Sequence, residues 1–132
     1  MQQDPHIWII DDDVLFIMIT RNNIRKSGVT CITEDFNNGK DALCEIKERV
    51  MVGEHIPNIL LLDLNMPLID GWDFLVEFKS IPLESRKNIK IYICTSSIDP
   101  KDLERAEAIT EVTSFLEKPI NTELIQKIVT SL

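Results

Sequence analysis

Long apolar runs are absent from this chain of 132 residues. No stretch approaches the roughly 20 residues that a membrane span needs. The first residues are polar and show no signal peptide. We therefore expect a cytoplasmic protein with no membrane partner.

Basic residues are outnumbered, and they form no run. Lys and Arg total 14 against 22 Asp and Glu, which gives a net charge of −8 and a pI of about 4.7. Nucleic acids and anionic membranes select basic surfaces. We therefore expect neither of them as a direct partner.

Cysteine is scarce, with Cys31, Cys44 and Cys94 at spacings that match no zinc pattern. Cys31 and Cys94 fall in apolar, strand-like segments, where a buried reduced thiol is the common state. The sequence also lacks a GxxxxGK phosphate loop, an HExxH motif and a Ser/His/Asp set. It shows no repeats, no low-complexity tracts and no shift in composition, so residues 1–132 are predicted to form one domain.

Short apolar segments alternate with longer, helix-like segments along the whole chain. Predicted strands are His6–Ile10, Cys31–Phe36, Asn58–Leu62, Ile89–Thr95 and Ser114–Glu117. Predicted helices are Val14–Ser27, Gly39–Val52, Trp72–Ser80, Lys101–Ile109 and Thr122–Ser131. The segments Val52–Pro57 and Ile81–Asn88 are predicted to be surface loops. This alternation favours an α/β fold with a parallel sheet covered by helices on both faces.

Polar signatures follow four of the predicted strands. They are Asp11-Asp12-Asp13, Asp63 with Asn65, Thr95-Ser96, and Lys118-Pro119. In open parallel sheets the ligand lies beyond the carboxyl ends of the strands. That rule brings three carboxylates, a hydroxyl and an ammonium to one edge, where they could bind a small hard cation and a phosphoryl group.

Each signature also has a purely structural interpretation. Asp11-Asp12-Asp13 could cap a helix and complement its dipole, or could bind Mg²⁺. Asp63 could simply start a turn, although it closes an all-apolar strand and Gly71 would give its loop steric room. Lys118 alone could be a surface charge. Pro119 is a candidate for a cis peptide bond, a minority state for such bonds.

Taken together, these positions resemble the receiver domain of bacterial two-component response regulators, and the resemblance spans nearly the whole chain. It implies a flavodoxin-like doubly wound five-stranded parallel sheet of order 2-1-3-4-5 with five helices, in a single-domain receiver like the chemotaxis regulators. Ser96 stands where the family often has Ala, and Phe115 stands where Tyr is commoner.

The resemblance implies a role for each site residue. Asp63 would be the phospho-acceptor, and Mg²⁺ would be held by Asp12, Asp63 and the backbone carbonyl of Asn65, with Asp11 acting through water. Lys118 would contact one phosphoryl oxygen, and Thr95 with a backbone N–H near Ser96 would contact another.

Two further roles follow from the same resemblance. Thr95 and Phe115 would form the conformational switch. The side chains of Asn65 and Ser97 would tune dephosphorylation.

The implied function is a signalling switch in a phosphorelay, not an enzyme acting on other substrates. Its partners would be a sensor histidine kinase or histidine phosphotransferase and a downstream protein target. One alternative is a haloacid-dehalogenase-type phosphatase, although that class needs a second acid where Asn65 stands. Another is a phosphorylation-independent receiver-like interaction module, which the complete acidic set disfavours.

The first predicted helix begins with six apolar residues, 14–19. One buried face needs only about half of them. The segment therefore predicts either a deeply buried helix or a docking surface beside the phosphorylation site.

Overall fold

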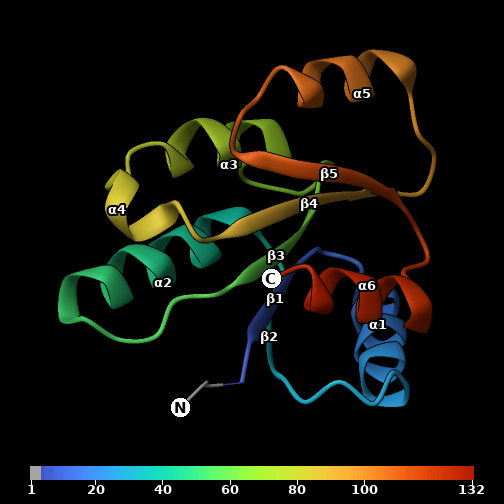
Figure 1. Cartoon of the computed structure of the whole chain (residues 1–132). Coiled ribbons are helices and arrows are strands. Elements are labelled where there is room, and N and C mark those ends of the chain that lie inside the picture. Colours follow the sequence, from blue (N-terminus) through green and yellow to red (C-terminus); the bar gives the residue numbers. More distant parts are fainter. Residues whose placement is uncertain (1–3) are drawn as a thin grey trace.

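The computed structural model describes residues 4–132 (Figure 1). Within that range, five parallel strands form one sheet in the order β2-β1-β3-β4-β5. The strands are β1 (His6–Ile10), β2 (Ile32–Phe36), β3 (Ile59–Asp63), β4 (Lys90–Thr95) and β5 (Val112–Glu117). The helices are α1 (Val14–Lys26), α2 (Gly39–Val52), α3 (Gly71–Phe78), α4 (Leu83–Arg86), α5 (Pro100–Glu107) and α6 (Thr122–Thr130). The predicted flavodoxin-like, doubly wound fold and its strand order are confirmed.

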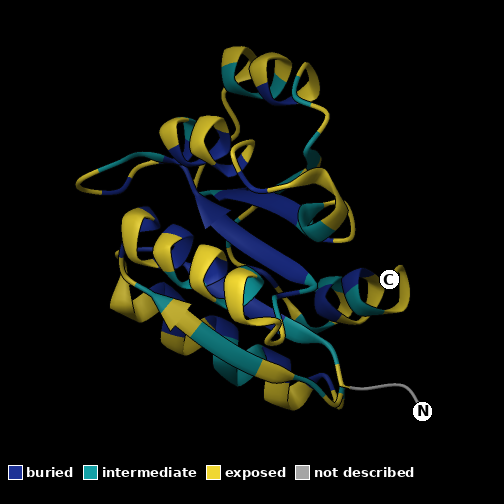
Figure 2. Cartoon of the chain, turned by 90° about the vertical axis from the view of Figure 1, so that its left-hand side faces the viewer, coloured by how far each residue is buried: buried dark blue, intermediate teal, exposed yellow. Residues whose placement is uncertain are grey.

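Helices pack on both faces of the sheet, and the alternation of side chains along β1 shows why. Trp8 and Ile10 belong to the core beneath α2 and α3, whereas Ile7 and Ile9 belong to the core beneath α1 and α6. Every residue of β3 is buried, as expected of a central strand that is covered on both sides. Figure 2 shows these central strands as a buried layer between the helices.

One of the two predicted long loops contains a helix that the sequence did not predict. Within residues 4–132 there are six helices rather than five, because α4 forms inside the segment Ile81–Asn88. The carbonyl of Pro82 starts this turn by accepting the N–H groups of Ser85 and Arg86 at 2.9 and 3.1 Å. The helix buries none of its own residues, so it carries no periodic apolar stripe that a sequence pattern could reveal.

The prediction of two buried thiols is right for Cys94 and wrong for Cys31. Cys94 is fully buried in β4, whereas Cys31 is only partly buried and lies just before β2. The reason is that β2 forms an edge of the sheet and pairs only with β1. The other helix and strand ends lie within two residues of their predicted positions. In the described part of the chain, no helix is both long enough and apolar enough to cross a membrane.

Candidate functional site

Three carboxylates meet at the carboxyl edge of the sheet. Asp11 and Asp12 follow β1, Asp63 ends β3, and one oxygen from each lies within 4.8 Å of the others. The two strands are neighbours in the sheet, in the register Ile10 opposite Leu62. Asp11 and Asp63 are 1% and 8% exposed, whereas Asp12 faces solvent. The cluster therefore has two buried acids and one accessible acid.

Asp13, the third acid of the run Asp11-Asp12-Asp13, has a structural role. Asp13 is the N-cap of α1, and its side chain accepts the N–H groups of Leu15 and Phe16 at 3.0 and 3.3 Å. Its own N–H donates to Oδ1 of Asp11 at 2.9 Å. The capping interpretation is therefore confirmed for Asp13 alone, and the two acids before it join the carboxylate cluster instead.

Lys118 supplies the positive charge of the site. Its Nζ donates to Oδ2 of Asp11 at 2.7 Å and lies 3.5 Å from Oδ1 of Asp63. Its backbone N–H donates to the carbonyl of Thr95 at 2.6 Å. The ammonium also lies 4.2 Å from the centre of the Phe16 ring. Lys118 therefore connects the ends of β1, β3 and β4.

Burial and charge change the ionisation of this cluster. Burial, followed by the nearby charge of Asp11, raises the pKa of Asp63 to about 6, although Lys118 and the N–H of Asn65 act in the opposite direction. Burial by itself would lower the pKa of Lys118, but the hydrogen bond and charge of Asp11 and the charge of Asp63 raise it overall. The ammonium thus stays protonated, while Asp63 lacks full charge compensation.

Thr95 ends β4 near the cluster, but its hydroxyl is engaged elsewhere. The hydroxyl donates to the carbonyl of Ser97 at 3.0 Å and accepts the Ser97 N–H at 3.4 Å. Among residues 4–132, it makes no hydrogen bond to Asp63 or Lys118. Ser97 itself is exposed.

Phe115 lies on β5, opposite Ile93 of β4. Its ring is partly buried against the core beneath α2 and α3. It also lines a hollow of about 220 Å³ between α5 and β5, together with Leu103 and Ala106. Phe115 therefore has open space beside it. Its strand, β5, is separated from Asp63 on β3 by strand β4.

The loop after β3 is held close to the sheet at Gly71. The Gly71 N–H donates to the carbonyl of Leu64 at 2.8 Å. A Cβ at this position would lie 2.7 Å from the carbonyl oxygen of Asp63 and 2.8 Å from Cα of Leu64. The prediction that the loop needs glycine at position 71 for steric reasons is therefore confirmed. Asn65 in this loop is exposed.

Two further features lie beside the site. The Lys118–Pro119 peptide bond is cis, and Pro119 is exposed. Leu68 has a φ of 71° and is 75% exposed, which is an uncommon backbone conformation for a branched apolar residue. Nothing in the sequence pattern pointed to Leu68 beyond its place in a turn after a proline.

The apolar start of α1 has both buried and exposed residues, so the two predictions of a buried helix and of an exposed apolar surface are each right for part of it. Phe16 and Ile17 are buried, at 6% and 7% exposure, whereas Val14, Leu15 and Met18 are 63–65% exposed. The helix thus contributes to the core and also presents an apolar surface next to the acidic cluster. We call the exposed residues Val14, Leu15 and Met18 the α1 surface.

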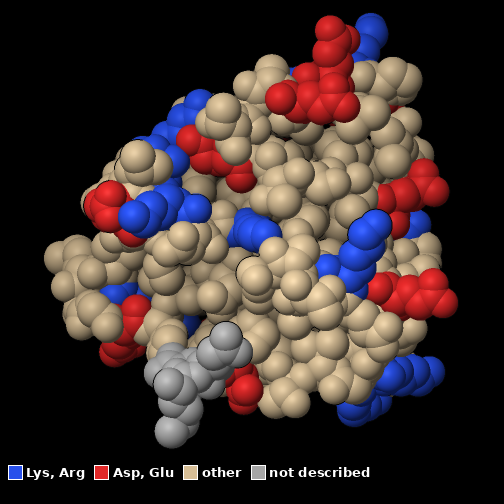
Figure 3. All heavy atoms as spheres, in the orientation of Figure 1, with Lys and Arg blue, Asp and Glu red and all other residues tan. Residues whose placement is uncertain are grey.

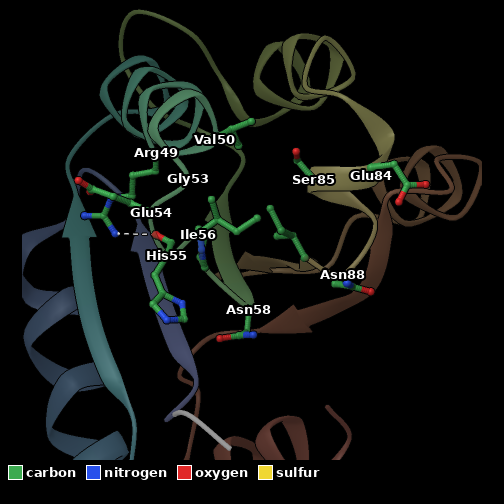
Figure 4. Close-up of a pocket in the computed structure, with 12 residues that line it drawn as sticks. Arg49, Val50, Gly53, Glu54, His55, Ile56, Asn58, Glu84, Ser85 and Asn88 are labelled. Atoms are coloured by element: carbon green, nitrogen blue, oxygen red, sulfur yellow. Dashed lines mark hydrogen bonds between the residues drawn. The ribbon is translucent and has the colours of Figure 1, made fainter.

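The surface charges and one large hollow lie apart from the acidic cluster. In Figure 3 the basic side chains are interspersed with acidic ones over the visible face, as expected of an acidic chain without basic runs. A hollow of about 450 Å³ lies at the opposite end of the sheet, where Arg49, His55 and Asn58 contribute to its lining (Figure 4). Arg49 is already bound by Glu34 and Glu45. None of the predicted site residues lines this hollow.

Comparison with known proteins agrees with this arrangement. The family model of the response regulator receiver domain matches residues 7–130. The probable methanogenesis regulatory protein FilR2 of Methanothrix harundinacea is 30% identical over 128 residues, which cover 96% of this chain and 81% of FilR2. The sensor histidine kinase CheAY of Helicobacter pylori is 28% identical over 126 residues, but the match covers only 15% of that protein.

Solved structures show the same fold. A two-component response regulator from Cytophaga hutchinsonii superposes with a TM-score of 0.89 at 25% identity, and the match covers 98% of this chain and 97% of that one. The chain belongs to the response regulator receiver domain family. Members of this family are signalling switches rather than classical enzymes.

Proposed function

We propose that residues 1–132 act as a receiver that accepts a phosphoryl group on Asp63 from a phosphohistidine donor. The observation that carries this proposal is the position of Asp63. Its carboxylate ends the buried strand β3, within 4.8 Å of two further carboxylates and 3.5 Å from the Lys118 ammonium. The three carboxylates and the ammonium therefore lie close enough together to serve as nucleophile, cation ligands and fixed positive charge.

The acidic cluster fits Mg²⁺, which prefers oxygen ligands and retains several waters. Asp12, Asp63 and the backbone carbonyl of Asn65 would hold it. Asp11 would act through water, because its Oδ2 is bound to Lys118. The ion would neutralise charge on the phosphoryl oxygens. Burial, followed by the charge of Asp11, raises the pKa of Asp63 to about 6, and a cation beside it would offset both by favouring the ionised carboxylate.

The reaction would be an in-line displacement at phosphorus. A carboxylate oxygen of Asp63 attacks, the P–N bond to the donor histidine breaks, and the electron pair leaves with the imidazole nitrogen. The transition state is loose, so catalysis consists mainly of positioning and charge neutralisation. Lys118 would supply a compact positive charge to one phosphoryl oxygen. Asn65 and Ser97 are small and exposed, so water would reach the acyl phosphate and the signal would decay.

Switching would follow from a change of partner for Thr95. Its hydroxyl now donates to the Ser97 carbonyl, and a phosphoryl group on Asp63 would offer a charged acceptor instead. A shift of Thr95 would change the space beside Phe115, which already borders a hollow. The surface formed by α5, β5 and α6 would then differ between the two states, and a downstream protein target could read that difference.

The α1 surface would receive the phosphohistidine donor. It is apolar, exposed and directly follows the acidic cluster in the chain. Exposed apolar patches beside a reaction site are typical docking surfaces. The match to a segment of a sensor histidine kinase supports a kinase-type partner.

Acetyl phosphate and Mg²⁺, followed by intact mass measurement, test the proposal. The wild type should gain one phosphoryl group, Asp63→Asn should gain none, and Asp70→Asn should behave as the wild type because Asp70 only caps α3. Labelling of Asp63→Asn at the wild-type rate would reject the assignment of Asp63. Rapid turnover without an adduct would indicate a phosphatase, and no reaction at all would indicate an interaction module that works without phosphorylation.

A further inference from the structure

A closed circuit of contacts links Lys118 to the first turn of α1. Asp11 accepts the N–H of Asp13 at 2.9 Å, and Asp13 accepts the N–H of Phe16 at 3.3 Å. The Phe16 ring centre lies 4.2 Å from Nζ of Lys118, and Nζ returns to Asp11 at 2.7 Å. Phe16 is the only apolar side chain in this circuit.

The lysine side chain is held by contacts of two kinds, hydrogen bonds to acids and an aromatic ring. Its ammonium is a point charge on a flexible four-carbon stem with three rotatable donors. It already donates to Asp11 and Asp63. These hydrogen bonds hold the ammonium from the side of the acids, and the Phe16 ring lies 4.2 Å from it as a further contact. An aromatic face attracts a cation through its quadrupole and so restricts the motion of the flexible stem.

The Phe16 ring is itself firmly placed. It is 6% exposed and belongs to the core that includes Ile9, Cys94 and Ile120. Its backbone N–H is bonded to the N-cap of the helix. A ring that is held by packing and by a cap can act as a rigid support for a mobile charge.

We propose that Phe16 is a positioning residue for the phosphoryl-binding lysine: its ring holds the Lys118 ammonium at the gap between Asp11 and Asp63. The positioning is a property of the unphosphorylated protein. Its effect on phosphorylation rests on the proposed function, since Lys118 must act on the phosphoryl group for that effect to appear.

The contact can be measured without any phosphorylation. In the wild type, the ring current of Phe16 should shift the ε-methylene protons of Lys118 upfield in a carbon–proton NMR spectrum. Phe16→Leu should return these protons to the positions of ordinary exposed lysines. Unshifted Lys118 protons in the folded wild type would overturn the proposal, whatever the protein does with acetyl phosphate.

The kinetic consequence is tested with two changes of different kind. Phe16→Leu removes the ring, and a fluorinated phenylalanine at position 16 keeps its shape but weakens the attraction for a cation. Each should slow phosphorylation of Asp63 by acetyl phosphate about fivefold at saturating Mg²⁺. Fluorination changes the ring quadrupole but hardly changes the ring shape, so a ring with a purely structural role would allow the wild-type rate. A fluorinated protein that reacts as fast as the wild type would therefore overturn the proposal.

Two controls separate positioning from loss of stability. Phe78→Leu makes the same truncation at a fully buried phenylalanine on the other face of the sheet, and it should leave the rate unchanged. In a Lys118→Met background, Phe16→Leu should slow the reaction no further, because the group it positions is gone. An equal additional loss in that background would contradict the proposal. If the wild type takes no phosphoryl group, the function proposed above fails, and the NMR shift still decides the role of Phe16.

Discussion

Lys118 is bound more closely to Asp11 than to Asp63. Its Nζ lies 2.7 Å from Oδ2 of Asp11 and 3.5 Å from Oδ1 of Asp63. Asp11 therefore has the closer contact with this ammonium, and Asp63 shares the same ammonium at a longer distance. This difference leaves Asp63 as the group that would gain most from an added cation.

The first prediction concerns that cation. Asp12→Ala should weaken Mg²⁺ binding by at least about tenfold and slow phosphorylation, because it deletes a proposed ligand. In the absence of metal the same change should raise the melting temperature, since it removes one of three crowded negative charges. Titration of Mg²⁺ and thermal unfolding measure the two effects.

The matched control is Glu104→Ala, which removes another exposed acid, in this case from α5. It should change neither the Mg²⁺ affinity nor the rate of phosphorylation. Unchanged Mg²⁺ affinity in Asp12→Ala would reject Asp12 as a ligand.

A substitution of Lys118 should affect the conformational change more than it affects the phosphorylation of Asp63. Lys118→Ala should still permit some phosphorylation, because the acids and their cation remain to position the donor. It should impair the conformational change, because the charge that draws the site together around the phosphoryl group is lost. Amide chemical shifts near Phe115 and Ile120, recorded with and without beryllofluoride, report that change. Shifts as large as those of the wild type at saturating beryllofluoride would contradict the coupling.

Stability of the metal-free protein should depend on pH through Asp63. Its pKa is raised from 3.8 to about 6, so between these values the folded protein binds this proton more tightly than the unfolded chain does. Its contribution to the free energy of unfolding therefore falls as pH rises through this window, by at most about 3 kcal/mol.

The sign of this effect can be tested with Asp63→Asn. The substitution should raise the melting temperature above about pH 7 and have little effect below about pH 4, because the carboxyl group is already protonated there. Mg²⁺ binding to the wild type should also weaken as pH falls below about 6. An equal gain in melting temperature at both extremes would contradict the assigned pKa.

Gly71 should tolerate no side chain. Gly71→Ala would place a Cβ 2.7 Å from the carbonyl of Asp63, and backbone cannot yield as a side chain can. We expect a loss of stability of about 1–3 kcal/mol together with slower phosphorylation, because Asp63 itself must move. Gly53→Ala is the comparison, since a Cβ there meets no atom within 4 Å and only the positive φ of 74° is strained. It should lose stability without any loss of phosphorylation rate.

Donor docking should depend on the α1 surface. Leu15→Ser with Met18→Ser should slow transfer from a phosphohistidine protein by about tenfold or more. The reaction with acetyl phosphate should be unaffected, because a small donor needs no docking surface. Met51→Ser, which changes an 86% exposed residue on α2, serves as the control. Equal slowing with both donors would show that the double variant damages the site rather than the docking surface.

The sequence by itself determined which residues lie at the candidate site. Parallel strands end at one edge of a sheet, so any polar residue that directly follows such a strand must lie there. That rule placed Asp11, Asp63 and Lys118 together, although the first and the last of them are 107 positions apart in the chain. The all-apolar run of β3 likewise identified the central strand, because only a strand covered on both faces can bury every one of its side chains.

The tertiary structure decided how those residues are used. Which acid caps α1, which acid pairs with Lys118, and which way the Thr95 hydroxyl points all depend on hydrogen bonds to neighbouring segments. The support of Lys118 by Phe16 depends on packing between α1 and the end of β5. Sequence patterns report the period of apolar residues within one segment, whereas side-chain directions and burial are set by segments distant in the chain. For the same reason the partial exposure of Cys31, beside an edge strand, is a property of the assembled sheet rather than of its own segment.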